Sequence, residues 1–362
     1  MIQKNKLMPS EEPSHLSELR SICTQAPCRV DLAGGTLDLW PLYLFHPGAV
    51  TVNFAVNIMT SCKITPLPGK SIHLRSLDTK KEDRFENLDS LRRARQLKHA
   101  LAASLVRLFA PEDGFLLETN SESPAGGGIA GSSALMIATA AALSRLCSRR
   151  LSLEEMRVLA QNVEAQLIGV PTGCQDYYPA LYGGVSAVHL EPQGIRREAL
   201  PVASEEIDAR FMLVYTGEPR RSGINNWQVF KSHVDGNKNV IKNFQHLAEL
   251  SRAMRPALAE GQWDEVARLL REEWKLRRSN YSGISTALID RLIAVAAKTG
   301  GRAAKVCGAG GGGCVIFMVK DGAKERVAEA LKVNGGHVLP CRVAPDGLAT
   351  NISKTRPQTA MV

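Results

Sequence analysis

The spacing of hydrophobic and polar residues predicts alternating strands and helices in the first half of the chain. Runs rich in Val, Ile, Thr and Phe predict strands at 26–32, 49–64, 115–118 and 181–188. Apolar residues at helical spacing predict helices at 97–109 and 132–146. Ser152, with Glu155 three residues later, forms a capping box that predicts the start of another helix.

The second half repeats this alternation, which favours an α+β or α/β fold. The expected strands are 211–215, 303–307, 314–319 and 337–341. The expected helices are 225–235, 240–258, 262–279, 286–299 and 322–333. Two stretches read as loops instead: residues 78–90 are charged, and residues 191–210 combine Pro, Gly and charge.

The length of 362 residues fits two domains. We take the loop-like stretch at 191–210 as the connection between them. The predicted division is a disordered lead-in at 1–22, an N-terminal nucleotide- and substrate-binding domain at 23–205, a C-terminal domain at 206–352 and a tail at 353–362.

The composition indicates a globular protein of a reducing compartment. Hydrophobic residues make up 44% and charged residues 22% of the chain, and no apolar run approaches the ~18 residues of a membrane span. The polar N-terminus lacks the apolar core of a secretory signal, so we expect a cytoplasmic protein with no membrane partner. The eight cysteines form no Cys-x-x-Cys pair, which predicts mostly buried thiols and no zinc site. Cys174 has no nearby histidine and is not expected to be a nucleophile.

The formal charge of +9 suits a polyanionic ligand such as a nucleotide. Aromatic residues are only 5% of the chain and do not alternate with the basic ones, so nucleic acid is not the expected partner. Residues 271–278 mix arginines with Glu272 and Glu273, a pattern typical of a solvated helix face.

Three segments carry the candidate chemistry: 26–38, 124–134 and 305–314. In the second, glycines lead directly into a predicted helix, whose first amides lack partners and whose dipole favours anions. This pattern predicts a phosphate cradle, and the hydroxyls of Ser132 and Ser133 are within reach of a magnesium ion or a phosphate oxygen. A flexible turn capped by Ser132 is the structural alternative.

Two of the glycine patterns also fit the dinucleotide-binding fingerprint, but their contexts do not. Gly126-x-Gly128-x-x-Gly131 is separated by polar residues from a short strand, and no acidic residue follows about 20 positions later. The run that starts at Gly308 is followed by a predicted strand instead of a helix.

Taken in this order and at these separations, the three segments resemble the signature motifs of the GHMP kinases, a superfamily that includes galactokinase, homoserine kinase, mevalonate kinase and phosphomevalonate kinase. The second segment is similar to the nucleotide loop of that family, with Ala130 and Gly131 where a glycine and a serine are usual. Residues 32–38 and 173–184 are similar to the heptose-7-phosphate 1-kinases and the fucose kinases. Galactokinases instead carry Glu-His where Gly35 and Thr36 stand.

The resemblance implies an α+β, two-domain GHMP kinase fold, with an N-terminal domain like ribosomal protein S5 domain 2 and a C-terminal ferredoxin-like split βαβ. It implies an ATP-dependent kinase that phosphorylates a sugar or sugar-phosphate hydroxyl, with the anomeric hydroxyl of D-glycero-D-manno-heptose 7-phosphate or a fucose-like sugar as the expected target. A mevalonate-like or amino-acid acceptor, and a catalytically silent relative that binds ATP and sugar, are the alternatives. ATP and Mg²⁺ are the expected cofactors, and the oligomeric state stays open.

The resemblance also assigns residues to roles. Asp176 matches the general base, and Arg29 matches a basic residue that would keep Asp176 ionised and stabilise charge on the moving phosphoryl group. Glu164 would hold magnesium together with Ser132. The expected nucleotide loop comprises Pro124, Gly126, Gly127, Gly128, Ile129, Ala130, Gly131, Ser132, Ser133 and Ala134.

The acceptor site is expected to bring together the first and third segments in a cleft between domains. Asp38 matches an acidic residue that accepts hydrogen bonds from substrate hydroxyls. Arg220, Arg221 and Ser222 follow a predicted strand end, and we hypothesise that they contact a phosphate group of the substrate or the nucleotide. The expected acceptor-site residues are Gly34, Gly35, Thr36, Asp38, Gly173, Gly310, Gly311 and Arg221.

Overall fold

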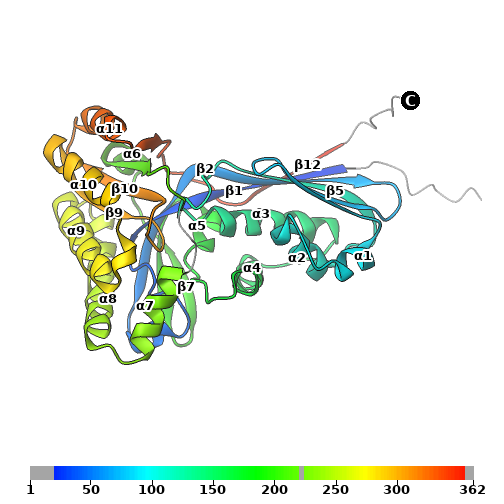
Figure 1. Ribbon diagram of the computed structural model, residues 1–362, viewed down its shortest axis with the longest axis horizontal. Coiled ribbons are helices and arrows are strands. Elements are labelled where there is room, and N and C mark those ends of the chain that lie inside the picture. Colours follow the sequence, from blue (N-terminus) through cyan, green and yellow to red (C-terminus); the bar gives the residue numbers. More distant parts are fainter. Residues whose placement is uncertain (1–19, 220–223, 355–362) are drawn as a thin grey trace, which may run out of the picture.

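The computed structural model of the chain describes residues 20–219 and 224–354. Figure 1 shows an elongated molecule with two lobes. The first lobe is built on an eight-stranded sheet of order β12-β1-β2-β5-β3-β4, in which β6 also pairs with β2 and β7 pairs with β6. All its pairs are antiparallel except β3 with β5. Its strands are β1 (Arg20–Ala33), β2 (Val50–Leu67), β3 (Ile72–Ser76), β4 (Lys81–Phe85), β5 (Gly114–Ser121), β6 (Val185–Glu191), β7 (Gly194–Ala199) and β12 (Ala349–Lys354).

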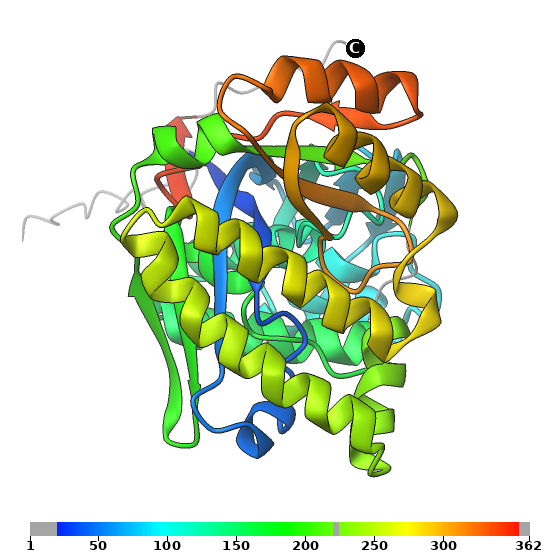
Figure 2. The ribbon, with the colours of Figure 1, turned by 90° about the vertical axis from the view of Figure 1, so that its left-hand side faces the viewer.

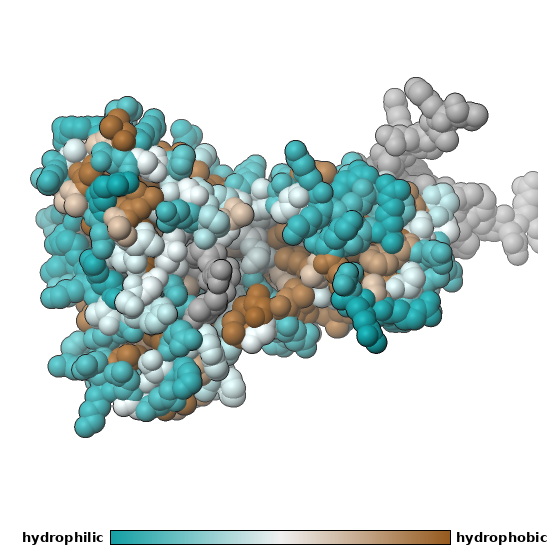
Figure 3. Space-filling model, viewed as in Figure 1, coloured by the Kyte–Doolittle hydropathy of each residue, from teal (hydrophilic) through white to brown (hydrophobic). Residues whose placement is uncertain are grey.

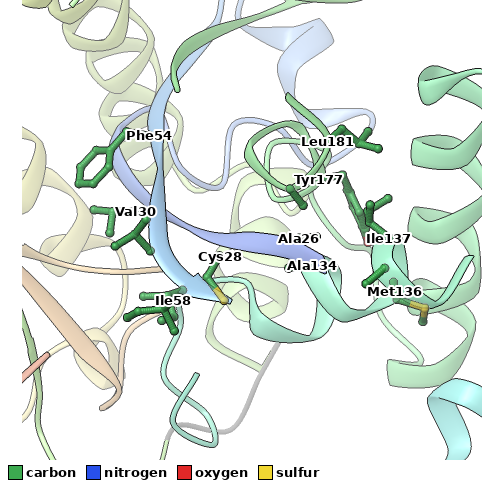
Figure 4. Packing of buried hydrophobic residues seen from close by; sticks show 14 of the residues in the cluster. Ala26, Cys28, Val30, Phe54, Ile58, Ala134, Met136, Ile137, Tyr177 and Leu181 are labelled. Carbon is green, nitrogen blue, oxygen red and sulfur yellow. The ribbon is translucent and has the colours of Figure 1, made fainter. Parts of the chain in front are cut away.

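Helices lie along one face of this sheet, and α3 is the central one (Figure 1). Nearly all residues of α3 itself are small or apolar, and the helix is buried on almost every side. Figure 4 shows Tyr177 and Leu181 of α5 directed toward α3, with Val30, Phe54 and Ile58 gathered elsewhere along β1 and β2. The helices of this lobe are α1 (Leu88–Arg93), α2 (Ala100–Phe109), α3 (Gly131–Leu146), α4 (Leu153–Ile168) and α5 (Tyr177–Tyr182).

The second lobe is built on a four-stranded antiparallel sheet of order β11-β8-β10-β9. In Figure 2 two long helices, α8 and α9, lie side by side in front of β1 and β2, and both contact the first sheet. The strands are β8 (Phe211–Tyr215), β9 (Gly301–Val306), β10 (Cys314–Val319) and β11 (His337–Leu339). The helices are α6 (Ser204–Arg210), α7 (Ile224–Val234), α8 (Lys238–Ala259), α9 (Trp263–Asn280), α10 (Ala287–Thr299) and α11 (Lys324–Val333), with short 3-10 turns η1 (Leu42–Phe45) and η2 (Ser282–Ile284).

Most predicted elements are confirmed within a few residues of their ends. The capping box is present: the side chain of Ser152 accepts a hydrogen bond from the amide of Glu155 at the start of α4. The predicted strand at 181–188 is wrong in its first four residues, because Leu181 and Tyr182 end α5 and the chain turns at Gly183 and Gly184, where φ is +67° and +65°. Only then does β6 begin.

The two expected loops contain regular structure. Residues 78–90 include β4 and the start of α1, which is capped by Asn87. Residues 191–210 include β7 and α6. These elements are short and rich in charge, so the hydrophobic pattern did not mark them. The division into domains at 205 stays a prediction, although β1 begins inside the expected lead-in and β12 returns from the far end of the chain to pair with β1.

A group of buried charges joins the two lobes. Asp31 on β1 is fully buried, and its Oδ2 accepts hydrogen bonds from Lys305 Nζ at 2.6 Å and from Arg277 Nη1 at 3.2 Å. Lys305 on β9 also donates to Glu273 Oε1 at 2.8 Å, and Glu273 Oε2 accepts from the amide of Gly34 at 3.2 Å. We call Asp31, Glu273, Arg277 and Lys305 the interlobe charge cluster.

The interlobe charge cluster corrects the prediction that residues 271–278 form a solvated face. Glu273 and Arg277 are 0% and 3% exposed, and they lie one helical turn apart on the face of α9 that meets the first lobe. Burial raises the pKa of Asp31, but the charges of Lys305, Arg29 and Arg277 outweigh it and hold that pKa well below its usual range. Asp31 is therefore ionised in the fold.

Replacing Lys305 by Met should destabilise the fold, because Asp31 and Glu273 would remain buried without their shared cation. Removing one partner of a buried ion pair typically costs about 3–5 kcal/mol. We expect the denaturant midpoint of Lys305→Met to fall accordingly at pH 7, whereas Lys298→Met, on an exposed position of α10, should stay within about 0.5 kcal/mol of wild type. Equal unfolding curves for the two variants would contradict this role.

Candidate active site

A cleft of about 420 Å³ lies between the two lobes and receives side chains from both. Figure 3 shows a hydrophilic surface over much of both lobes, with a narrower waist between them. The residues that line the cleft and were expected in the site are Arg29, Gly35, Thr36, Asp38, Pro124, Gly126, Gly127, Gly128, Ala130, Gly131, Ser132, Ser133, Glu164, Gly173 and Asp176.

The glycine-rich loop reaches α3 through a series of left-handed backbone conformations. Gly126, Gly128 and Ala130 have φ values of +63°, +78° and +60°. Ala130 is the N-cap of α3 and makes no side-chain capping bond, so Ser132 does not cap the helix as the structural alternative proposed. The leading amides of α3 therefore face the cleft without a side-chain cap, as an anion site requires.

Arg29 and Asp176 are brought together from β1 and the residue before α5. Arg29 Nε and Nη2 donate to Asp176 Oδ1 at 2.8 and 2.6 Å, and Arg29 Nη1 donates to the carbonyl of Gly128 at 2.7 Å. Burial lowers the pKa of Arg29, while the charges of Asp176 and Asp31 raise it above its ordinary value. One guanidinium thus links the glycine-rich loop to Asp176, and no described residue donates to Asp176 Oδ2.

Glu164 on α4 lies beneath the start of α3. Its carboxylate accepts hydrogen bonds from the hydroxyls of Ser132, Ser133 and Tyr177. The side chain is 7% exposed, and burial raises its pKa against the lowering effect of these three hydroxyls. Both serines therefore contact the same carboxylate.

Asp38 lines the same cleft as the glycine-rich loop and lies in a turn of the first lobe. Its Oδ2 accepts a hydrogen bond from the amide of Gln175 at 2.9 Å. A Cβ on Gly173 would come within 2.0 Å of the same oxygen, so only glycine fits beside it. Burial, and secondarily the charge of Asp176, raises the pKa of Asp38 to about 7.

The third segment, 305–314, packs against the second, the glycine-rich loop. The amide of Cys314 donates to the carbonyl of Gly127 at 2.7 Å, and a Cβ on Gly313 would come within 2.8 Å of the same oxygen. Gly308 and Ala309 line the cleft, while Gly310 and Gly311 pack against the η2 region around Ile284. The segment therefore packs against the glycine-rich loop and also borders the cleft.

The other expected site residues are not among those that line the cleft. Ile129 is buried, and its carbonyl accepts from the amide of Arg29. Ala134 packs in the core, and Gly34 donates its amide to Glu273. Arg221, with Arg220 and Ser222, lies outside the described residues.

Among the lining residues that sequence reasoning missed are Asp31, Gln175, Asn226 and Arg277. Asp31 follows Arg29 by two positions on the same strand, a spacing that puts both side chains on one face. Arg277 and Asn226 come from helices of the second lobe, and no local pattern marks a helix residue that meets a distant loop.

The cysteines are mostly buried, as predicted. Cys174 is fully buried beside the cleft, and burial together with the charge of Asp38 raises the pKa of its thiol well above the ordinary value. A thiol held protonated in this way is a poor nucleophile, in agreement with the sequence-based expectation.

Comparison with known proteins matches both lobes to one family. Residues 94–184 match the GHMP kinases N terminal domain, and residues 254–336 match the GHMP kinases C terminal domain. The chain is 25% identical over 341 residues to the D-glycero-alpha-D-manno-heptose 7-phosphate kinase of Campylobacter jejuni, covering 91% of this chain and 98% of that protein. It is 26% identical to the bifunctional fucokinase/GDP-fucose pyrophosphorylase of Arabidopsis thaliana, with 87% of this chain and 31% of that longer protein covered.

Solved structures share the fold. A D-glycero-D-manno-heptose 1-phosphate kinase from Bacteriodes thetaiotaomicron superposes with a TM-score of 0.72 at 23% identity, covering 91% of this chain and 98% of that one. Lactococcus lactis galactokinase complexed with galactose gives a TM-score of 0.76 at 19% identity, with 91% and 95% covered.

The glycine-rich loop and the Arg29–Asp176 pair lie directly beside each other in the interlobe cleft, an arrangement that fits a small-molecule kinase. The chain belongs to the GHMP kinase superfamily, as its three motifs predicted, and it has the two-domain α+β fold of that family. GHMP kinases depend on ATP, so ATP is the phosphoryl donor and an alcohol is the acceptor. None of the helices in the described ranges has the length and apolar character needed to cross a bilayer.

The raised pKa of Asp38 predicts a pH dependence of acceptor binding. Below pH 7 the carboxyl is protonated, and as the pH rises through about 7 it becomes a carboxylate that only accepts hydrogen bonds. We expect the KM of the acceptor to fall as pH rises through 7, changing about tenfold per unit on the acid side.

This dependence is measured from pH 5.5 to 8.5 with wild type and Asp38→Asn, using the KM of ATP as the internal control. The acceptor inflection should vanish in Asp38→Asn, while the ATP profile stays the same in both proteins. An inflection near pH 7 that persists in Asp38→Asn would assign it to another group.

Proposed function

We propose that this chain is a sugar kinase, which transfers the γ-phosphate of ATP to a hydroxyl of a sugar or sugar phosphate, with the anomeric hydroxyl as the expected target. The observation that carries the proposal is the position of Arg29, which bonds both Asp176 and the carbonyl of Gly128 in the glycine-rich loop. This places the proposed base directly beside the proposed phosphate site.

The transfer needs little covalent chemistry from the protein, so positioning and charge stabilisation dominate. The uncapped amides at the start of α3 would bind the phosphates of ATP. Asp176 Oδ2 would accept the proton of the attacking hydroxyl as the new O–P bond forms and the bond to the ADP oxygen breaks. Arg29 would hold Asp176 in its ionised form and stabilise charge on the transferred group.

The residues around Ser132 fit a magnesium ion. The hydroxyl of Ser132 and the carboxylate of Glu164 supply the hard oxygen donors that Mg²⁺ prefers. The described chain gathers no group of three or more His, Cys, Asp or Glu side chains that could hold a metal alone, which agrees with an ion held largely by nucleotide phosphates. When bound, the ion would neutralise phosphate charge.

We call the part of the cleft around Asp38 its acceptor half. The charges there support a polyhydroxylated acceptor. Arg29 is paired with Asp176, and Arg277 is paired with Asp31. Asp38 forms no ion pair with any residue that the structure describes, and a carboxylate suits the donor hydroxyls of a sugar. The heptose and fucose kinases among the relatives support the same class. If the acceptor carries a phosphate, Arg221 stays the proposed contact.

The proposed location is the cytoplasm. All eight cysteines are free thiols, and most are buried, which suits a reducing compartment.

Asp176→Asn tests the reaction, because the amide keeps the shape of the side chain but cannot take a proton. We expect kcat to fall by about 10²–10⁴-fold, with ATP still raising the melting temperature. ADP release is measured with a panel of free sugars, sugar phosphates, mevalonate and homoserine. Asp113→Asn, on an exposed loop, is the control. Turnover of mevalonate or homoserine without any sugar would overturn the sugar assignment, and an active Asp176→Asn would overturn the role of the base.

Glu164→Gln tests the proposed metal site. The amide keeps the size of the side chain and one acceptor oxygen for these hydroxyls, and its nitrogen can donate to a hydroxyl oxygen on the other side, but the charge that attracts a cation is lost. We expect the Mg²⁺ concentration for half-maximal activity to rise about tenfold, since one charged ligand is lost. Glu249→Gln, exposed on α8, should leave it unchanged. An unchanged Mg²⁺ requirement in Glu164→Gln would contradict this assignment.

A further inference from the structure

Most hydrogen-bond donors in the acceptor half of the cleft are already engaged by protein groups. Arg29 donates to Asp176 and Gly128, and Arg277 donates to Asp31 and to the carbonyl of Gly308. The side-chain amide of Gln175 points its nitrogen toward Asp38 Oδ1, at 3.4 Å. The carboxylates there only accept hydrogen bonds, so a bound hydroxyl would still need a donor for its own oxygen.

Asn226, in the first turn of α7, supplies such a donor. It lines the cleft beside Gly35 and Thr36, and its Oδ1 accepts a hydrogen bond from the hydroxyl of Thr36 at 3.1 Å. That bond fixes the orientation of the amide, and no described residue accepts from its Nδ2. The adjacent Asn225 anchors the same helix by donating to the carbonyls of Gly283 and Ala309.

The backbone of Thr36, which makes the contact with Asn226, is strained. Thr36 has a φ of +78°, in the left-handed region that a β-branched residue rarely occupies. Its neighbour Gly35 cannot carry a Cβ, which would come within 2.8 Å of Asp31 Oδ2 and 3.0 Å of Arg277 Nη1. Strained, tightly fixed backbone of this kind gathers at ligand sites.

We propose that Asn226 is a specificity-determining residue, whose Nδ2 donates a hydrogen bond to a hydroxyl or ring oxygen of the acceptor. This inference rests on the proposed function, because it assigns a contact within the acceptor site of that kinase. In this arrangement Asp38 and Asp176 accept hydrogen bonds from hydroxyls of the bound sugar, whereas Asn226 donates a hydrogen bond to one of its oxygens. A sugar hydroxyl both donates and accepts, so this arrangement matches a polyol and disfavours an acceptor that lacks the contacted oxygen.

Asn226→Asp separates substrate contact from a structural role. The carboxylate can still accept from Thr36, but it has no N–H group to donate. We expect the KM of the acceptor to rise at least about tenfold, with the KM of ATP and the melting temperature unchanged. Asn239→Asp makes the same substitution on an exposed position of α8 and should behave as wild type.

Monodeoxy analogues of the best acceptor in the panel then identify the contacted oxygen. For one analogue, the penalty in kcat/KM should be large in wild type and nearly absent in Asn226→Asp, because the partner is already lost. The other analogues should cost the same in both proteins.

The two proposals fail differently. Turnover of mevalonate or homoserine alone would overturn the sugar assignment, while the KM comparison for Asn226→Asp would still run on that acceptor. Turnover of sugars with an unchanged acceptor KM in Asn226→Asp, or with equal penalties for every analogue, would overturn the role of Asn226 alone.

Discussion

The carboxylate of Asp31, enclosed by cations from the opposite lobe, is the constraint on which the geometry of the cleft depends. Lys305 and Arg277 both donate to it, and the amide of Gly308 donates to its other oxygen at 3.1 Å. Since Arg29 lies two residues away on the same strand, whatever fixes Asp31 also fixes Arg29. The second lobe thus places a residue of the first, although it contributes few side chains to the chemistry.

Two carboxyl groups in one cleft have different environments. Asp176 forms an ion pair with Arg29, whereas Asp38 is buried and accepts hydrogen bonds from the amide groups of Gln175. A guanidinium stabilises the ionised state, and burial without a cation favours the neutral one. Sites that give two carboxyl groups such different environments often use them for different tasks. The arrangement follows from backbone placement, because Asp38 fits only beside the bare Cα of Gly173.

The sequence predicted the parts of the site that depend on local pattern. The glycine-rich loop and the helix after it form one continuous segment, and Arg29 and Asp176 belong to recognisable motifs. What the sequence could not show are contacts across the interface between lobes. Glu273 and Arg277 sit among exposed arginines, and their burial is decided by β1, about 240 residues earlier in the chain. Short, charged elements such as β4 and β7 were missed for a similar reason, since pairing with a neighbouring strand determines them more than their own composition does.

The final strand has a consequence for synthesis of the protein. Residues Arg20–Gln25 of β1 pair with residues 349–354 of β12, so one flank of the first sheet is closed by the last described part of the chain. Until the ribosome releases that part, the amides and carbonyls along this flank of β1 lack their partner strand. An open sheet edge is a template for pairing with other chains. The nascent first lobe therefore carries an exposed edge during translation of the whole second lobe, and β12 covers that edge only after the second lobe has been made.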